Sequence, residues 1–278
     1  MHHVGDDVVE KTLVMRDQDH RPLRRAELIH PGRDDAQGAV AGKYLADHYK
    51  GKHVAVVHDK TAYGKGIADE TMKAMNKAGL KEVMYEAITQ GDKDFSALVS
   101  KMKQANIDVI YFGGYQTEGG LIVRQMRDQG FKAQFIGADA LVTEEFWKIT
   151  GPAGEGTLMT FPPDPRKVPA AKAVVDKFTA QGYNPEGYTL YTYAAIQAFA
   201  AAADKAKSVK LDDLSKALHS MTVPTVVGPL TWDRKGDITD PKYVFYLEER
   251  NLRRDVESRT HAARPVHPRD ACPSITDS

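Results

Sequence analysis

The stretch "VIYFGGYQTEGG", residues 109–120, brings a strand, a turn and a helix start together within twelve positions. Its first four residues are apolar and β-prone, so they predict a buried strand. The two glycines that follow, Gly113 and Gly114, let the backbone turn tightly and leave space for a ligand to come close. A helix-like segment opens at Thr117. Tyr115 is therefore expected just beyond the strand end, facing a pocket.

The same pattern repeats on both sides of this stretch. Short apolar segments alternate with amphipathic ones, two of which close on glycine, and the apolar segments scarcely alternate with polar residues. Such a rhythm predicts an α/β fold in which a parallel sheet is covered by helices on both faces, giving three layers. The expected strands are 53–58, 82–88, 108–114, 134–139 and 156–161, and the expected helices between them are 64–79, 94–106 and 117–130.

After Phe161 the pattern changes. The proline-rich "PPDPRK" predicts a linker, followed by helices at 167–182, 188–207 and 211–221, two short strands within 225–237 and a last strand at 243–250. The first half of the segment 188–207 is apolar nearly all round, so that helix is expected to be buried. The polar ends, residues 1–31 and 251–278, show little or no apolar periodicity, and the second of them is expected to be disordered.

Composition excludes several functional classes. Lys plus Arg and Asp plus Glu are both 38, so the formal charge is zero, which argues against nucleic-acid binding and against a polybasic membrane surface. The single cysteine, Cys272, allows no internal disulfide. The start of the chain lacks an export signal, and no stretch is long enough to span a bilayer. His2 and His3 at the terminus are too few for a metal site, so no metal is expected.

The carboxyl ends of three predicted strands carry the candidate binding residues. Ligands of parallel sheets bind at that edge, and there the sequence presents Tyr63, Tyr115 and Asp139. A carboxylate and two aromatic rings suit a ligand that has an ammonium group and an apolar part. The alternative is that each tyrosine packs at the sheet edge and that Asp139 caps the next helix. The polar run 58–60 is expected to be solvated.

No enzyme signature is found where one is expected. A G-x-S-x-G elbow, a P-loop and a G-x-G-x-x-G turn are all absent after the strands, so no catalytic residue and no cofactor are predicted.

From about Arg33 to Phe245 the sequence resembles the branched-chain amino-acid binding proteins, periplasmic receptors that feed leucine, isoleucine and valine to ABC importers. The resemblance is carried, in order, by "GRDDAQGAVAGKYLADHYKGKHVAVVHDKTAYGKG", "GDKDFSAL", "IDVIYFGGY", "AGEGTLMTF", "YTYAAIQAFA" and "VVGPLTWDRKGD".

This resemblance implies the type I fold, in which two α/β lobes close on a ligand like a hinged clamp. Residues 32–163 with 243–250 would be the second lobe, and 164–242 part of the first lobe. Residues 1–31 do not resemble the early half of that lobe, so the first lobe would be incomplete. Its hydroxyl and N–H groups for the ligand carboxylate would then be missing, and its remaining helices would expose apolar surface.

The resemblance also implies roles for the three rim residues. Tyr63, Tyr115 and Asp139 match the ligand contacts of the second lobe, and Asp139 stands where an acid binds the ammonium group. The implied protein is a monomeric, non-catalytic receptor for a free amino acid that works with an ABC permease in the periplasm, with Leu, Ile or Val favoured and Phe as an alternative. Without an export signal the chain as written would stay in the cytoplasm. A ligand-sensing regulatory domain of the same fold is the alternative function, although residues 1–31 show no helix-turn-helix.

Overall fold

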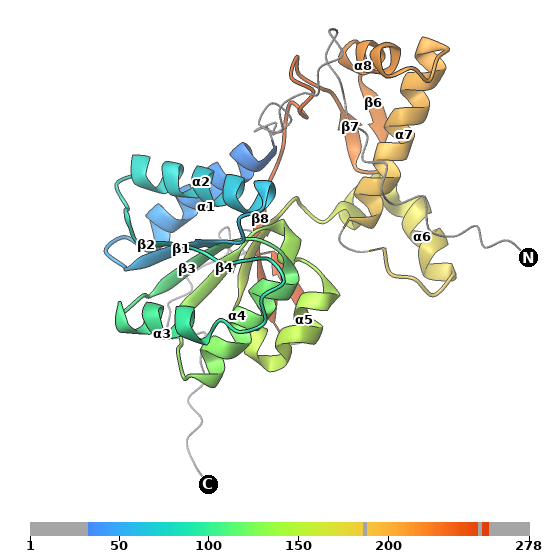
Figure 1. Ribbon diagram of the computed structural model, residues 1–278. Coiled ribbons are helices and arrows are strands. Elements are labelled where there is room, and N and C mark those ends of the chain that lie inside the picture. The colour runs from blue at the N-terminus through green and yellow to red at the C-terminus, as the bar shows by residue number, and fades with distance from the viewer. Residues whose placement is uncertain (1–32, 186–187, 250–251, 256–278) are drawn as a thin grey trace, which may run out of the picture. The chain divides into compact units, whose positions relative to one another are not determined.

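The computed structural model describes residues 33–185, 188–249 and 252–255, and Figure 1 shows the arrangement of their elements. The α-helices are α1 Arg33–His48, α2 Ala62–Lys77, α3 Ser96–Gln104, α4 Gln116–Asp128, α5 Glu144–Thr150, α6 Lys172–Ala180, α7 Thr189–Ala206 and α8 Leu211–His219. The strands are β1 Val54–His58, β2 Glu82–Ala87, β3 Val109–Gly113, β4 Gln134–Gly137, β5 Leu158–Phe161, β6 Val223–Thr225, β7 Gly228–Leu230, β8 Val244–Glu249 and β9 Leu252–Asp255. Short 3-10 helices are η1 Asp139–Leu141, η2 Gly151–Gly154, η3 Pro165–Lys167 and η4 Pro169–Ala171.

A seven-stranded sheet forms the centre of the larger part, in the order β2-β1-β3-β4-β5-β8-β9. Strands β1 to β5 are parallel, and β8 and β9 join antiparallel beside β5. All five strands predicted in this region are confirmed within a few residues. Their carboxyl ends meet at one edge because parallel strands all run the same way.

Helices cover both faces of this sheet, which confirms the three-layer prediction. In Figure 1, α1 and α2 lie over one face, while α3, α4 and α5 lie over the other. Successive strand residues point to opposite faces, so one core takes Val57 and Phe112 and the other takes Val56 and Tyr111. Burial on both sides explains why the strand sequences are continuously apolar.

The segment between β5 and β8 forms small cores of its own. One is built around Leu190 and Val226, and a second joins Ala202 to Leu214. Strands β6 and β7 pair only with each other, antiparallel. The chain then returns from this segment to the large sheet as β8, which pairs with β5.

Helix α7 departs from the prediction that it would be buried. Only a stripe at four-residue spacing is covered, consisting of Leu190, Ala194, Ala198 and Ala202. On the other faces Ile196 is 65% exposed and Phe199 is 52% exposed. The expectation of exposed apolar helix surface is therefore confirmed, because the described elements that pack against α7 cover only that stripe.

Strand β9 corrects the prediction that residues 251–278 are disordered, at residues 252–255. Its sequence, LRRD, lacks apolar alternation, but Glu249 pairs with Leu252 across the β8–β9 ladder. The backbone of β8 supplies hydrogen bonds along its second edge, and these need no apolar side chains. The predictions for residues 1–31 and 256–278 lie outside the described residues.

Candidate functional site

The site lies where the strand order reverses. From β1 the chain moves outward to β2 and then returns to place β3 on the other side of β1, so the connections after β1 and β3 run to opposite faces. Such a switch point leaves a crevice beyond the strand ends in open α/β sheets. The connection after β1 leads directly to Tyr63, and the one after β3 leads to Tyr115.

Each candidate residue starts a helix. Tyr63 lies in the first turn of α2, which begins at Ala62, two residues before the predicted start at residue 64. The helix begins there because the Thr61 hydroxyl accepts a hydrogen bond from the Gly64 N–H and caps it. Tyr115 is the residue before α4, and Asp139 is the first residue of η1. Helix starts after parallel strands all lie at the same sheet edge, so the three residues lie along one rim.

The structure brings Tyr63, Tyr115 and Asp139 into one cluster. The Tyr63 hydroxyl donates a 2.7 Å hydrogen bond to Oδ1 of Asp139. The rings of Tyr63 and Tyr115 are tilted by 43° with centroids 5.2 Å apart. Asp139 is only 8% exposed, whereas Tyr115 is 37% exposed and reaches the surface. The predicted gathering of these three residues is confirmed.

The electrostatics of the cluster favour a neutral phenol beside a carboxylate. Burial raises the pKa of Tyr63 well above its ordinary value, and the nearby Asp139 raises it further. The Tyr63 hydroxyl therefore stays protonated and donates a hydrogen bond to Asp139. Asp139 does not cap a helix with its side chain, contrary to the structural alternative, since η1 begins without a side-chain cap and Thr143 caps α5.

Tyr188 belongs to the same cluster and was missed in the sequence. Its hydroxyl donates a 2.8 Å hydrogen bond to Oδ2 of Asp139, and its ring meets Phe161 edge-on at 5.1 Å. It directly precedes α7, in a run of tyrosines that the sequence predicts to lie together in a buried helix. No local sequence pattern distinguishes Tyr188 from Tyr191 and Tyr193. Only the contact of its hydroxyl with Asp139 in the folded chain does so.

The role predicted for the two glycines is also corrected. A Cβ atom at Gly113 would lie 2.1 Å from the carbonyl oxygen of Gly64, and one at Gly114 would lie 2.5 Å from the Phe112 ring. Neither glycine has a positive φ. Glycine is needed at both positions because the chain itself fills the space where a side chain would lie.

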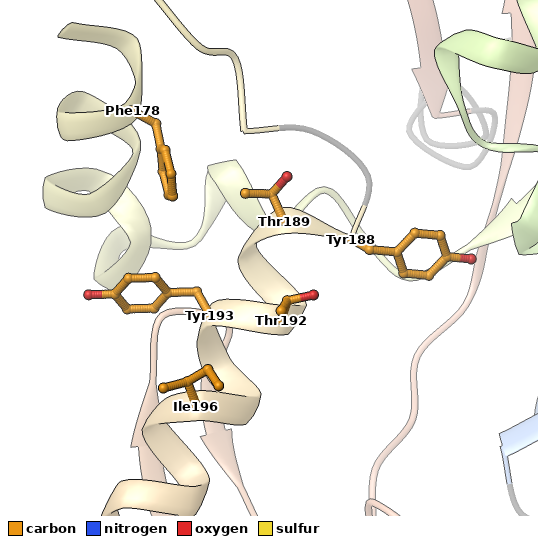
Figure 2. Close-up of a pocket in the computed structure, with 6 residues that line it drawn as sticks. All are labelled: Phe178, Tyr188, Thr189, Thr192, Tyr193 and Ile196. Atoms are coloured by element: carbon orange, nitrogen blue, oxygen red, sulfur yellow. The ribbon is translucent and has the colours of Figure 1, made fainter. Parts of the chain in front are cut away.

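An open hollow of about 530 Å³ lies beside α7 (Figure 2). It is lined by side chains that are mainly apolar but carry four hydroxyls, namely Phe178, Tyr188, Thr189, Thr192, Tyr193 and Ile196. In Figure 2 the Tyr188 ring extends away from Phe178 and Tyr193, and its hydroxyl is the group that reaches Asp139. Tyr188 is thus shared by the hollow and the rim cluster.

Two further findings concern the described part of the chain. No three His, Cys, Asp or Glu side chains come together there in a way that would hold a metal ion. No helix in the ranges 33–185 and 188–249 combines the length and apolar character needed to cross a bilayer. The rim itself holds a buried carboxylate beside phenol donors, and a carboxylate can accept hydrogen bonds from a cationic group.

Comparison with known proteins identifies the lineage. The sequence profile of the periplasmic binding protein family matches residues 21–249. A Leu/Ile/Val-binding protein homolog 1 from Brucella melitensis biotype 1 is 53% identical over 220 residues, which are 79% of this chain and 59% of that protein. An amino acid binding protein from Pseudomonas aeruginosa is 50% identical over 217 residues, covering 77% of this chain and 58% of that protein.

A solved structure shows the same fold. The leucine binding protein LivK from Thermotoga maritima MSB8 superposes with a TM-score of 0.73 at 25% identity, covering 80% of this chain and 64% of that one. The chain thus spans less than two thirds of each of these relatives. A family profile that covers most of the sequence, and relatives at about half identity, lead to one conclusion. The chain belongs to the periplasmic binding protein family.

Proposed function

We propose that the chain is a receptor for a free amino acid with an apolar side chain, and that Asp139 binds the ammonium group. The observation that carries this proposal is the state of Asp139, which is 8% exposed and whose two oxygens are met by the neutral phenols of Tyr63 and Tyr188. The described residues place no cation against it. A buried carboxylate without a cationic partner is costly, and an ammonium group would offset that cost.

The carboxylate retains acceptor capacity for such a ligand. Its two oxygens together offer about four acceptor positions, and the phenols use two of them. The exposed ring of Tyr115 lies beside Tyr63 and offers a face to the same cation. Such a contact adds about 0.5–2 kcal/mol, depending on how far water is excluded. The ligand's apolar side chain would cover the tyrosine rings.

The names of the relatives favour leucine, isoleucine or valine as the ligand. The Brucella relative is named a Leu/Ile/Val-binding protein homolog and the Thermotoga protein a leucine binding protein. Phenylalanine is the next candidate, since aromatic rings stack as well as they cover aliphatic chains. We further propose that the receptor acts in the periplasm and delivers its ligand to the permease of an ABC importer.

The arrangement of the lobes is part of the proposal. We assign residues 32–163 and 243–250 to the second lobe and residues 164–242 to part of the first. This division is supported by β8, which returns to the large sheet next to β5 after the intervening segment. It is supported too by the separate small cores around Leu190 and Ala202. Tyr188 would then be the contribution of the first-lobe segment to the ligand site.

Calorimetry tests the proposal directly. Purified protein is titrated with leucine, isoleucine, valine and phenylalanine, and heat release is expected with at least one of them. Asp139→Asn keeps the size of the side chain but removes its charge, and it should weaken binding more than tenfold, because a charge-assisted hydrogen bond is lost at about 1.5–3 kcal/mol. Asp47→Asn is the matched control, because Asp47 is an exposed acid paired with Lys43 on α1.

Two fragments of leucine identify the group that Asp139 recognises. Isopentylamine carries the ammonium group without the carboxylate and should compete with leucine, whereas 4-methylpentanoate carries only the carboxylate and should not. No heat with any of the four amino acids in a folded sample would contradict the proposal. Binding that survives Asp139→Asn unchanged would contradict the role of Asp139.

A further inference from the structure

A second acid, Asp59, is buried just behind the rim. It follows β1 directly and is 1% exposed, although the polar run 58–60 is predicted to be solvated. Its Oδ1 atom accepts two hydrogen bonds, from the Thr61 N–H at 3.0 Å and from the Thr61 hydroxyl at 2.7 Å. Its Oδ2 atom is fully covered and has no hydrogen-bond partner within the described residues. A buried carboxylate oxygen without a hydrogen-bond partner is rare, so the presence of an acid at this position needs an explanation.

The contact between Asp59 and Thr61 sets the direction of the Thr61 hydroxyl. That hydroxyl has one proton and gives it to Asp59, so only its lone pairs remain for the N–H of Gly64, which lies 2.9 Å away. This second bond is the cap of α2, and Tyr63 lies between the two residues that make it. Asp59 therefore acts on Tyr63 through Thr61.

Asp59 also contacts the connection that leads to Tyr115. Its backbone N–H donates to the carbonyl of Gly113 at 3.1 Å. A Cβ atom at Gly64 would lie 2.1 Å from Oδ1 of Asp59, and one at Gly114 would lie 3.1 Å from Oδ2. The carboxylate thus packs between the start of α2 and the turn after β3. The first of these segments contains Tyr63 and the second leads to Tyr115.

We propose that Asp59 is a positioning residue for the ligand site. It holds the rings of Tyr63 and Tyr115 together beside Asp139. It does so through its hydrogen bond with the Thr61 hydroxyl and through its close packing against Gly64 and Gly114. It touches no ligand itself. The proposal rests on the proposed function only in assuming that these tyrosines meet the ligand. The placement of the rings is testable without any ligand.

The first measurement is therefore made on the free protein at neutral pH. With ring-labelled tyrosine, assigned by comparison with Tyr63→Phe, nuclear Overhauser cross-peaks report the approach of Tyr63 to Tyr115, whose centroids are 5.2 Å apart. Thr61→Val removes the hydroxyl at nearly constant shape and should weaken these cross-peaks several-fold. Thr61→Ser keeps the hydroxyl and should restore them. Asp59→Asn, which keeps the volume but weakens the acceptor, should give an intermediate loss.

The matched control is Thr143→Val. Thr143 caps α5 in the same way, by accepting a hydrogen bond from the N–H of Phe146 at 3.2 Å. Losing it costs a comparable amount of stability but should leave the Tyr63–Tyr115 cross-peaks in place. Unchanged cross-peaks in folded Thr61→Val or Asp59→Asn, or equal losses in Thr143→Val, would overturn the proposal.

The second measurement is leucine affinity. Thr61→Val should weaken binding about tenfold, the factor that corresponds to one displaced hydrogen bond, and this loss should vanish in a Tyr63→Ala background. A loss of the same size in both backgrounds would mean a general structural role and would overturn the positioning role. If the unaltered protein binds no leucine while the cross-peaks change as expected, the proposed function fails and the positioning role stands.

Discussion

Tyr63 and Asp139 are joined by a 2.7 Å hydrogen bond, although 76 residues separate them in the sequence. The bond connects the start of α2, after β1, with the start of η1, after β4. Its acceptor is a buried carboxylate, and burial together with that carboxylate raises the pKa of the Tyr63 phenol. A single contact thus contributes to the stability of the fold and to the shape of the binding rim.

Removing the Tyr63 hydroxyl should therefore be costly even without ligand. Tyr63→Phe leaves one fewer donor to the buried Asp139, so we expect the free energy of unfolding to fall by about 1–3 kcal/mol. Urea denaturation measures this change. Tyr183→Phe serves as the control, since Tyr183 is exposed and its hydroxyl contacts, within the described residues, only the Thr189 hydroxyl, at 2.9 Å. Equal losses in the two variants would show that the contact with Asp139 is not special.

Two glycines of the same helix should respond in opposite ways to alanine. A Cβ atom at Gly64 would collide with Oδ1 of Asp59 at 2.1 Å and with the Gly113 carbonyl at 2.6 Å, whereas one at Gly66 would meet no described residue within 4 Å. We expect Gly64→Ala to destabilise the protein by about 1–3 kcal/mol through overpacking. Gly66→Ala should stabilise it by about 0.5–1 kcal/mol through helix propensity. Thermal unfolding of both variants decides, and a tolerated Gly64→Ala would contradict the packing described around Asp59.

The buried histidine at the end of β1 should make stability depend on pH. Burial lowers the pKa of His58, Lys65 lowers it further, and Asp69 and Asp59 oppose the shift. The folded protein thus favours the neutral ring, while the unfolded chain takes up a proton near pH 6.5. The unfolded state then binds more protons, so this contribution to stability is complete above about pH 6.5 and is lost as the pH falls below it.

A variant isolates this contribution from the other histidines. Nδ1 of His58 accepts a hydrogen bond from the Lys60 N–H at 3.0 Å, and the side-chain oxygen of asparagine can take that bond. His58→Asn should therefore lose less stability than the unaltered protein when denaturation midpoints at about pH 7.5 and about pH 5.5 are compared. An identical pH dependence in both proteins would show that His58 does not contribute to it.

The exposed face of α7 should affect solubility more than stability. Ile196→Ser and Phe199→Ser replace side chains that are more than half exposed, so we expect the free energy of unfolding to change by less than about 0.5 kcal/mol. Leu190→Ala, on the buried stripe of the same helix, should cost about 2–4 kcal/mol. Light scattering at increasing concentration should show less self-association for the two serine variants, since an apolar patch is removed. Unchanged scattering would contradict that role of the patch.

Much of the large sheet could be predicted because its information is local. Strands buried on both faces need unbroken apolar runs, such as 54–57 and 109–112, and the helices between them need one apolar stripe. Parallel strands end at the same edge, so the first residues beyond them had to share a rim. That reasoning alone places Tyr63, Tyr115 and Asp139 together, and the structure agrees.

What the sequence could not determine depends on contacts between segments that are far apart along the chain. In the sequence Tyr188 cannot be distinguished from its neighbouring tyrosines. In the structure its hydroxyl contacts Asp139, which lies 49 residues earlier in the chain. The sequence predicts that His58 and Asp59 are solvated, but in the structure the start of α2 and the turn after β3 bury them. Likewise, α7 has the composition of a buried helix, but its exposure is decided by how much neighbouring surface there is to cover it. Periodicity tells which residues require burial, whereas only the packed chain decides which groups meet and which side chains remain exposed.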